Sequence, residues 1–188
     1  KKQMQNQKNQ EASKSKVAVF LGGYSFERHI SVESGRNIYE KLASSEKYAP
    51  MPVFLMKDGD SHRLFQIPIN LLLKDNADDI RDKILKNEHH PVIDEIKASL
   101  TQMTETYSGS DTIFNAVEIS YEELREKANA VFIALHGRPG EDGEVQARLD
   151  EMGLPYNGCS AEASSVTINK YNTLQTLKQH GFSVTDQL

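Results

Sequence analysis

Two glycine-rich segments carry the residue types that could bind a charged small molecule. The first, LGGYSFERHISVESG, spans residues 21–35 and places Glu27 and Arg28 shortly after Gly22 and Gly23. Glycines allow close backbone approaches that a Cβ atom forbids, and a helix start presents free N–H groups to an anion. The alternative is a tight strand-to-helix turn in which Glu27 only stabilises the helix dipole. The motif alone favours neither interpretation.

The second segment, HGRPGEDG, spans residues 136–143 and directly follows an apolar run. Its His136 could orient a substrate, relay a proton or bind a metal, or it could simply cap the strand by bonding a backbone carbonyl. Metal binding is the least favoured of these roles, because His136, Asp142 and Glu144 lack the spacing of a known ligand set. Asp142 is better explained as an acid that organises the loop at the next helix start.

The composition excludes two classes of protein. The 188 residues carry a net charge of −5 without a basic cluster, which argues against a nucleic-acid partner. No apolar stretch reaches the roughly 20 residues of a membrane span, which argues against a membrane protein. The single cysteine, Cys159, cannot form an internal disulfide, so we expect a cytoplasmic setting.

Strands and helices alternate along the chain. Residues 17–21 (VAVFL) predict a buried strand, and small then aliphatic residues at helical spacing over 31–42 predict a helix that packs closely on the sheet. Residues 48–56 predict a second strand, hydrogen-bonded only from Val53 onward because Pro50 and Pro52 precede it. Asp58-Gly59 then indicates a hairpin.

The rest of the chain predicts further helices and strands, least clearly in the insertion. Residues 77–87 and 92–103 can form amphipathic helices within a decorating insertion. Ser120 and Glu123 form a capping box, and a buried strand follows. The remaining expected elements are a helix over 145–152 that Gly153 ends, a short strand at 154–156, a helix over 163–180, and a strand beginning after Gly181.

This alternation predicts an α/β fold with a doubly wound, mainly parallel sheet flanked by helices and a hairpin and helical insertion. Ligands of such sheets collect beyond the carboxyl ends of the strands. Both glycine-rich loops leave strands at those ends. We therefore expect residues 22–31 and 136–143 to form two halves of one site.

Two long motifs carry a family resemblance. VAVFLGGYSFERHISVESG and VFIALHGRPGEDGEVQARLDEMGLPYNGCSAEASSVTINK resemble the N-terminal part of D-alanine–D-alanine ligases of the ATP-grasp superfamily. The family patterns are GGxSxERxxSxxSG and HGxxGEDGxxQGxLExxGxPYxG, followed by a helix bearing DK. The match covers residues 17–35 and 131–188. It implies a Rossmann-like pre-ATP-grasp domain over 17–159, with a variable insertion at about 57–120.

The two ends of the chain are expected to lie outside this domain. Residues 1–16 hold only Met4 and Ala12 as apolar side chains, so they have nothing to bury and are expected to be a flexible tail. By the resemblance, residues 160–188 would be a helix and the first strand of a truncated ATP-grasp central domain.

The resemblance also implies roles for individual residues. Glu27 would hold the ammonium group of the first D-alanine as the catalytic-site acid, and it would bind substrate together with Gly23, Ser31, His136 and Gly137. A zwitterion needs a fixed negative group close to a donor-rich helix end, and a glutamate beside a glycine turn supplies both. Ser31 would be a hydroxyl partner for Glu27 or His136, or alternatively a small residue packed on the sheet.

By the same resemblance, Lys170 would reach the nucleotide phosphates. The resemblance places no metal ligand in this part of the protein. Three positions depart from the family pattern. His29 stands where an acid is common, Ala147 replaces a glycine, and Asn169 replaces the aspartate before Lys170. Arg28 would either brace the loop by pairing locally or be solvated.

The implied reaction joins two D-alanines. Such enzymes transfer the γ-phosphoryl group of ATP to the first carboxylate, and the second amine attacks the acyl phosphate. Mg²⁺ (or Mn²⁺) and the oxyanion donors would come from later domains, so this fragment should be inactive alone. The family makes peptidoglycan precursors in the bacterial cytoplasm, for cell-wall biogenesis and cell shape, and commonly forms homodimers.

Two alternatives stay open from the sequence. One is a ligase that joins D-alanine to D-lactate or D-serine. The other is a non-catalytic α/β module for small-ligand binding or dimerisation. A ligase requires Glu27 and His136 to face one site, whereas a module without that ancestry has no need to bring them together.

Overall fold

The sheet of this protein is mixed. A computed structural model describes residues 14–88, 113 and 115–185, and its five strands lie in the order β4-β3-β2-β1-β5. β1 (Ser15–Gly22) pairs in parallel with both β2 (Tyr48–Asp58) and β5 (Ala130–Ile133). β3 (Ser61–Gln66) and β4 (Val117–Ile119) extend the sheet antiparallel. The expected α/β fold is confirmed, with antiparallel strands added at one edge only.

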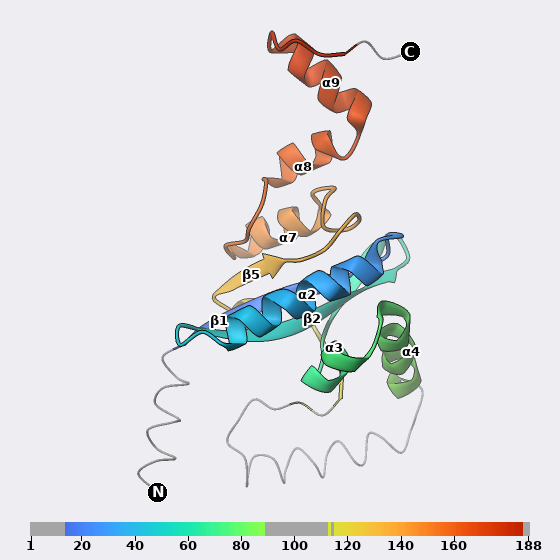
Figure 1. Cartoon of the computed structure of the whole chain (residues 1–188), viewed down its shortest axis with the longest axis vertical. Coiled ribbons are helices and arrows are strands. Elements are labelled where there is room, and N and C mark those ends of the chain that lie inside the picture. Colours follow the sequence, from blue (N-terminus) through green and yellow to red (C-terminus); the bar gives the residue numbers. More distant parts are fainter. Residues whose placement is uncertain (1–13, 89–112, 114, 186–188) are drawn as a thin grey trace, which may run out of the picture.

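Helices cover both faces of this sheet (Figure 1). Alternate residues of β1 enter opposite cores: Ala18 and Phe20 pack on one side, and Val19 and Leu21 on the other. The first core includes residues of α6 (Tyr121–Lys127) and α7 (Glu144–Met152). The second includes residues of α2 (Arg28–Ala43), α3 (Ile69–Lys74) and α4 (Ala77–Glu88). A strand buried on both faces must be apolar throughout, which explains the VAVFL run.

α2 lies very close to β1, as the small residues at its start predict. Gly35 is buried, and a Cβ atom added there would lie 2.7 Å from Cβ of Leu21. Ser31 and Val32 are buried on the same face. This close packing fixes the start of α2, and therefore the loop before it, against the carboxyl end of β1.

β2 begins at Tyr48 as predicted, but its paired part starts earlier than the predicted Val53. Its pairing with β1 starts at Tyr48 and runs through Pro50 and Pro52. The carbonyl of Pro52 accepts a hydrogen bond from Ile67 N–H at 3.1 Å. The backbone N–H and C=O groups of the even-numbered residues of β2 therefore point toward β3 and not toward β1. Pairing with β3 begins only at Val53, so the missing N–H groups of both prolines leave no gap in the ladder.

The local turn and cap signals are confirmed. The hairpin between β2 and β3 pairs Asp58 with Ser61 across Gly59. Ser120 and Glu123 form the capping box of α6, and Gly153 ends α7 in the left-handed conformation. α4 confirms the helix expected over residues 77–87. The second helix expected in the insertion, over 92–103, lies outside the described residues.

The predicted limits of two segments were wrong. β1 begins at Ser15, so residues 15 and 16 belong to the sheet and not to the tail, the rest of which lies almost entirely outside the described residues. The helix expected over 163–180 is two helices, α8 (Ala161–Thr167) and α9 (Lys170–Gln179). Asn169 causes the break, because its side-chain oxygen accepts a hydrogen bond from Asn172 N–H at 3.1 Å and caps α9.

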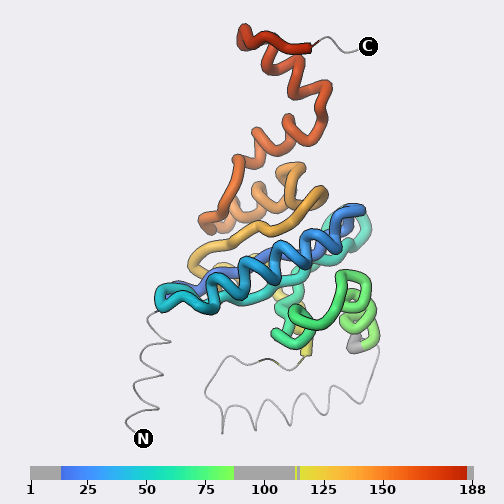
Figure 2. The backbone as a smooth tube through the Cα atoms, viewed as in Figure 1, coloured from blue at the N-terminus to red at the C-terminus, as the bar shows by residue number. Residues whose placement is uncertain are grey.

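The last described residues form no strand. The strand expected after Gly181 is absent from residues 182–185, and the short strand at 154–156 is reduced to one bridge between Tyr156 and Val131. α9 buries none of its residues. Figure 2 shows α8 and α9 extending from one end of the molecule. Within the described residues, no helix combines the length and apolarity that crossing a bilayer demands.

Candidate functional site

The two glycine-rich loops lie against each other, as their strands predict. The hydroxyl of Ser25 donates to the carbonyl of His136 at 2.6 Å, and the N–H of Tyr24 donates to the carbonyl of Arg138 at 3.3 Å. The N–H of His136 donates to Oγ of Ser31 at 2.8 Å. The loop after β1 and the loop after β5 are therefore joined by backbone and hydroxyl groups along their length.

Glycines make this approach possible. Gly23 and Gly137 both have positive φ angles, of 82° and 70°. A Cβ atom at Gly23 would lie 2.9 Å from the carbonyl oxygen of Arg138, and one at Gly137 would lie 2.6 Å from Cβ of Ser25. Side chains at either position would separate the two loops.

His136 is held by α2. The ring is half-buried, and its Nε2 atom lies 2.8 Å from Oγ of Ser34, one turn beyond Ser31. Among the described residues, its other ring nitrogen makes no hydrogen bond. Ser31 bonds the backbone of His136 and, at 3.3 Å, the carbonyl of Glu27, so the expected hydroxyl contact exists through main-chain groups. Sequence reasoning missed Ser34, although it lies one residue from Gly35 in the first motif.

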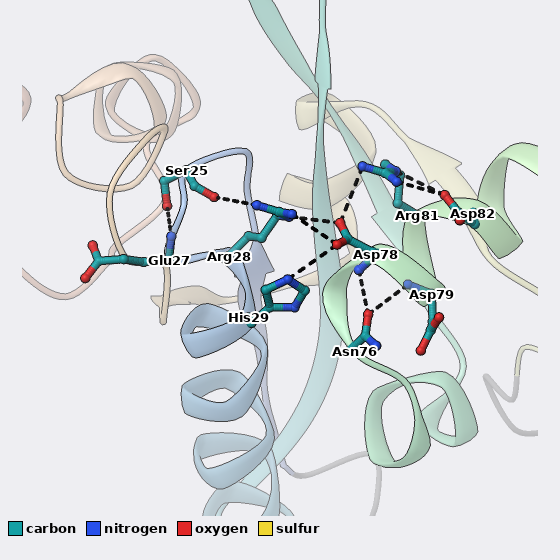
Figure 3. Close-up of polar contacts among 9 residues, drawn as sticks. All are labelled: Ser25, Glu27, Arg28, His29, Asn76, Asp78, Asp79, Arg81 and Asp82. Carbon is teal, nitrogen blue, oxygen red and sulfur yellow. Dashed lines mark hydrogen bonds and ion pairs between the residues drawn. The ribbon is translucent and has the colours of Figure 1, made fainter.

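Glu27 stands immediately before α2, at the N-cap position, and its side chain is exposed. Its N–H bonds Oγ of Ser25 at 3.1 Å, but its carboxylate makes no hydrogen bond to cap the helix. A Cβ atom at Gly137 would lie 3.8 Å from Oε2 of Glu27, which places the carboxylate beside the second loop. No side chain in the described part of the chain pairs with this carboxylate. Figure 3 shows it pointing away from Arg28 and Asp78.

Arg28 does not pair with Glu27. Its Nε and Nη2 atoms donate to both carboxylate oxygens of Asp78 on α4, at 2.9 and 3.0 Å, and Nη1 donates to the carbonyl of Ser25 at 3.3 Å. The hydrogen bond from Arg28 lowers the pKa of Asp78. His29 also faces α4, with Nε2 3.4 Å from Oδ2 of Asp78 (Figure 3). Both residues that follow Glu27 are therefore turned toward the insertion.

A partly buried chain of polar side chains lies on the other side of the first loop. The hydroxyl of Tyr24 donates to Glu144 at 2.8 Å, and Glu144 lies 2.6 Å from Nδ1 of His62. Nε2 of His62 lies 2.6 Å from the hydroxyl of Tyr121, and the His62 side chain is only 2% exposed. Burial raises the pKa of Tyr24 and Tyr121, and the hydrogen bond to Glu144 adds to this for Tyr24. No local signal in the sequence predicted this chain, because its members come from four separate elements.

Lys170 does not join this site. It is the first residue of α9, it is exposed, and Figure 1 places α9 beyond α8, away from the sheet. Its role at a nucleotide stays a prediction.

The described residues contain no group of three or more His, Cys, Asp or Glu side chains that could hold a metal ion. A pocket of about 340 Å³ lies elsewhere, between β3, α6 and α7, with His62, Tyr121 and Arg148 in its wall. Its two arginines are already paired, Arg63 with Glu118 and Arg148 with Glu151, so neither is left to an anionic ligand.

A family comparison decides what these loops belong to. The family described as D-ala D-ala ligase N-terminus matches residues 16–159. The chain belongs to the D-Ala-D-Ala ligase N-terminal family. The match contains both glycine-rich loops, the insertion and all five strands apart from the first residue of β1. The family resemblance drawn from the two motifs is confirmed.

Whole relatives of this family are longer than the chain. The D-alanine–D-alanine ligase of Chlorobium limicola is 33% identical over 160 residues, which are 84% of this chain and 39% of that protein. The D-alanine–D-alanine ligase of Chlorobaculum tepidum is 28% identical over 180 residues, 93% of this chain and 43% of that protein. The chain thus spans less than half the length of these relatives.

Solved structures share the fold. The D-alanine–D-alanine ligase of Coxiella burnetii superposes with a TM-score of 0.57 at 26% identity, over 93% of this chain and 43% of that one. The VanG D-Ala:D-Ser ligase of Enterococcus faecalis superposes with a TM-score of 0.60 at 20% identity, over 92% and 44%. The second likeness concerns the fold alone.

Proposed function

We propose that this chain supplies the first D-alanine site of an ATP-dependent D-alanine–D-alanine ligase. The observation that carries the proposal is the Glu27 carboxylate, which is exposed, has no partner in the described part of the chain and lies beside the loop that contains His136 and Gly137. A carboxylate at this position suits the ammonium group of a small zwitterion.

The neighbouring groups suit the other end of the same molecule. The first turn of α2 presents backbone N–H groups, and the backbones of Gly23 and Gly137 each lie close against the opposite loop, at Arg138 and at Ser25. In this proposal Ser31 fixes the His136 backbone, and the second ring nitrogen of His136, which bonds no other group among the described residues, is available to the substrate.

The proposal extends to the whole ligase. ATP would phosphorylate the first D-alanine, and the amine of the second would attack the acyl phosphate. In this proposal the further length of the relatives binds Mg²⁺ (or Mn²⁺) and makes most of the ATP contacts, and Lys170 of this chain reaches the nucleotide phosphates. The setting is the cytoplasmic synthesis of peptidoglycan precursors by a homodimer.

D-alanine titrated into the isotope-labelled 188-residue chain and followed by NMR tests the first site. A charge-assisted contact contributes about 1.5–3 kcal/mol, so Glu27→Gln should weaken binding by about tenfold or more. Glu40→Gln is the matched control, because Glu40 is an exposed acid on the same helix, and it should bind like the parent. Equal D-alanine binding by Glu27→Gln and the parent would reject the site and favour a module of another function.

The second substrate is tested separately. The full-length protein is supplied with ATP, D-alanine and either D-serine or D-lactate, and the products are identified by mass spectrometry. The proposal predicts D-alanyl-D-alanine as the main product. A depsipeptide or a D-alanyl-D-serine product would assign the chain to one of the alternative ligases.

A further inference from the structure

The insertion reaches the candidate site through one carboxylate. Asp78 is the second residue of α4 and binds both Nε and Nη2 of Arg28, the residue next to Glu27, at 2.9 and 3.0 Å (Figure 3). The two side chains are only 30% and 36% exposed. This two-point contact fixes the plane of the guanidinium group as well as its position.

Asp78 is itself firmly held. The side-chain oxygen of Asn76 accepts hydrogen bonds from the N–H groups of Asp78 and Asp79 at 2.9 and 3.0 Å, which caps α4. Ile80 and Ile84 anchor the helix in the core at 0% and 1% exposure. The position of the carboxylate is therefore set by α4 and not by the loop that it contacts.

The Arg28–Asp78 pair keeps the Arg28 guanidinium away from the Glu27 carboxylate. Arg28 adjoins Glu27 in the chain, and a released guanidinium would compete with a ligand's ammonium group for the exposed carboxylate. Asp78 takes up that charge. Its carboxylate also lies 3.4 Å from Nε2 of His29 and 3.4 Å from Nη1 of Arg81, so a second guanidinium group, that of Arg81, is held at this edge of the helix pair.

We infer that Asp78 is a positioning residue of the amino-acid site: it directs Arg28 away from Glu27 and so leaves the Glu27 carboxylate to the substrate ammonium. The inference rests on the proposed function, because it assumes that Glu27 binds D-alanine. It assigns a role in substrate binding to a helix of the insertion, which lies outside both family motifs.

NMR titration of D-alanine into the 188-residue chain tests this role. Asp78→Asn should weaken binding by about fivefold, because a cation now adjoins the Glu27 carboxylate, and the loss should shrink at high salt. Asp79→Asn is the matched control: it removes the same charge from the same turn without touching Arg28, and it should bind like the parent. Asp78→Glu should recover most of the affinity.

The double variant Arg28→Gln/Asp78→Asn separates positioning from simple support of the fold. Removing the released guanidinium should restore binding to within about twofold of the parent. If the double variant stays as weak as Asp78→Asn, Asp78 acts through loop structure and the inference is overturned. Arg28→Gln alone should also bind within about twofold of the parent, which keeps the test decisive if Asp78→Asn does not fold.

The two proposals fail in different ways. If Glu27→Gln weakens binding and Asp78→Asn does not, the D-alanine site stands and the role of Asp78 is rejected. If Glu27→Gln binds like the parent, the D-alanine site itself is rejected.

Discussion

Oγ of Ser31 accepts a hydrogen bond from the backbone N–H of His136 at 2.8 Å, joining residues that are 105 positions apart in the chain. Ser31 is fully buried at the start of α2. The same hydroxyl also lies 3.3 Å from the carbonyl of Glu27. The Ser31 hydroxyl therefore links the backbone of Glu27 in the first loop to the backbone of His136 in the second.

Replacing Ser31 with alanine should destabilise the chain. The N–H of His136 would lose its partner in a buried place, which costs about 1–3 kcal/mol in the free energy of unfolding. Urea denaturation followed by circular dichroism measures this. Ser34→Ala is the control, because it removes only the ring contact of His136 and leaves the backbone N–H bonded. A smaller loss for Ser31→Ala than for Ser34→Ala would contradict the role given to Ser31.

Gly35→Ala should also destabilise, although alanine is a better helix former by about 1 kcal/mol. The added methyl group would lie 2.7 Å from Cβ of Leu21, so α2 must move away from β1. Overpacking of this kind costs about 1–3 kcal/mol. Asn37→Ala, on the exposed side of the same helix, should be neutral or stabilising. Thermal unfolding of both variants checks the prediction. A Gly35→Ala variant that is more stable than the parent would show that α2 and β1 can accommodate a methyl group between them.

The sequence predicted those features that depend on near neighbours. The capping box of Ser120 and Glu123, the left-handed Gly153 and the turn at Gly59 each follow from residue types within four positions. The break before α9 was missed although it is also local. Asn169 departs from the family motif and is also a residue type that caps helices, and the second property decides where α9 begins.

Contacts between distant segments were beyond sequence reasoning. Hydrophobic periodicity shows which face of an element is buried but does not say which polar residue meets which. Arg28 finds Asp78 across 50 positions, and His62 finds Glu144 across 82. The approach of the two loops was predictable, because parallel strands end at a common edge. The side chains that brace them from the insertion were not.

The ion pair at Asp78 makes an acid-dependent contribution to stability. The hydrogen bond from Arg28 lowers the pKa of Asp78, so the folded state favours the charged carboxylate. This stabilisation is present above the unfolded pKa of about 3.9 and is lost as the pH falls through the lower pKa of the folded state. The free energies of unfolding of the parent and of Asp78→Asn should therefore converge as the solution is acidified below about pH 4.

Denaturation measured at several pH values checks this convergence. Asp79→Asn supplies the comparison, since Asp79 lies on the same turn and no ion pair holds its side chain within the described residues. The difference between the parent and Asp79→Asn should stay nearly constant with pH. A constant difference for Asp78→Asn as well would mean that the pair with Arg28 contributes nothing in solution.

The half-buried phenols of Tyr24 and Tyr121 should limit stability in alkali. Burial raises the pKa of both, so the folded state favours their neutral forms. Their contribution is intact below the unfolded pKa of about 10 and is lost as the pH rises through the folded values. Ultraviolet titration of the native chain should therefore leave at least these two of its seven tyrosines protonated above pH 10, with ionisation completed when denaturant is added.

Tyr121→Phe isolates one of these two groups. It removes one of the tyrosines that stay protonated above pH 10 in the titration. It also leaves Nε2 of the buried His62 side chain without its partner, which lowers the free energy of unfolding by about 1–3 kcal/mol near neutral pH. Tyr171→Phe, on exposed α9, should change neither the delayed phase nor the free energy of unfolding. If all seven phenols ionised reversibly in the folded chain at about pH 10, the Tyr24–Glu144–His62–Tyr121 chain would be open to water. It would then brace neither α7 nor the first loop.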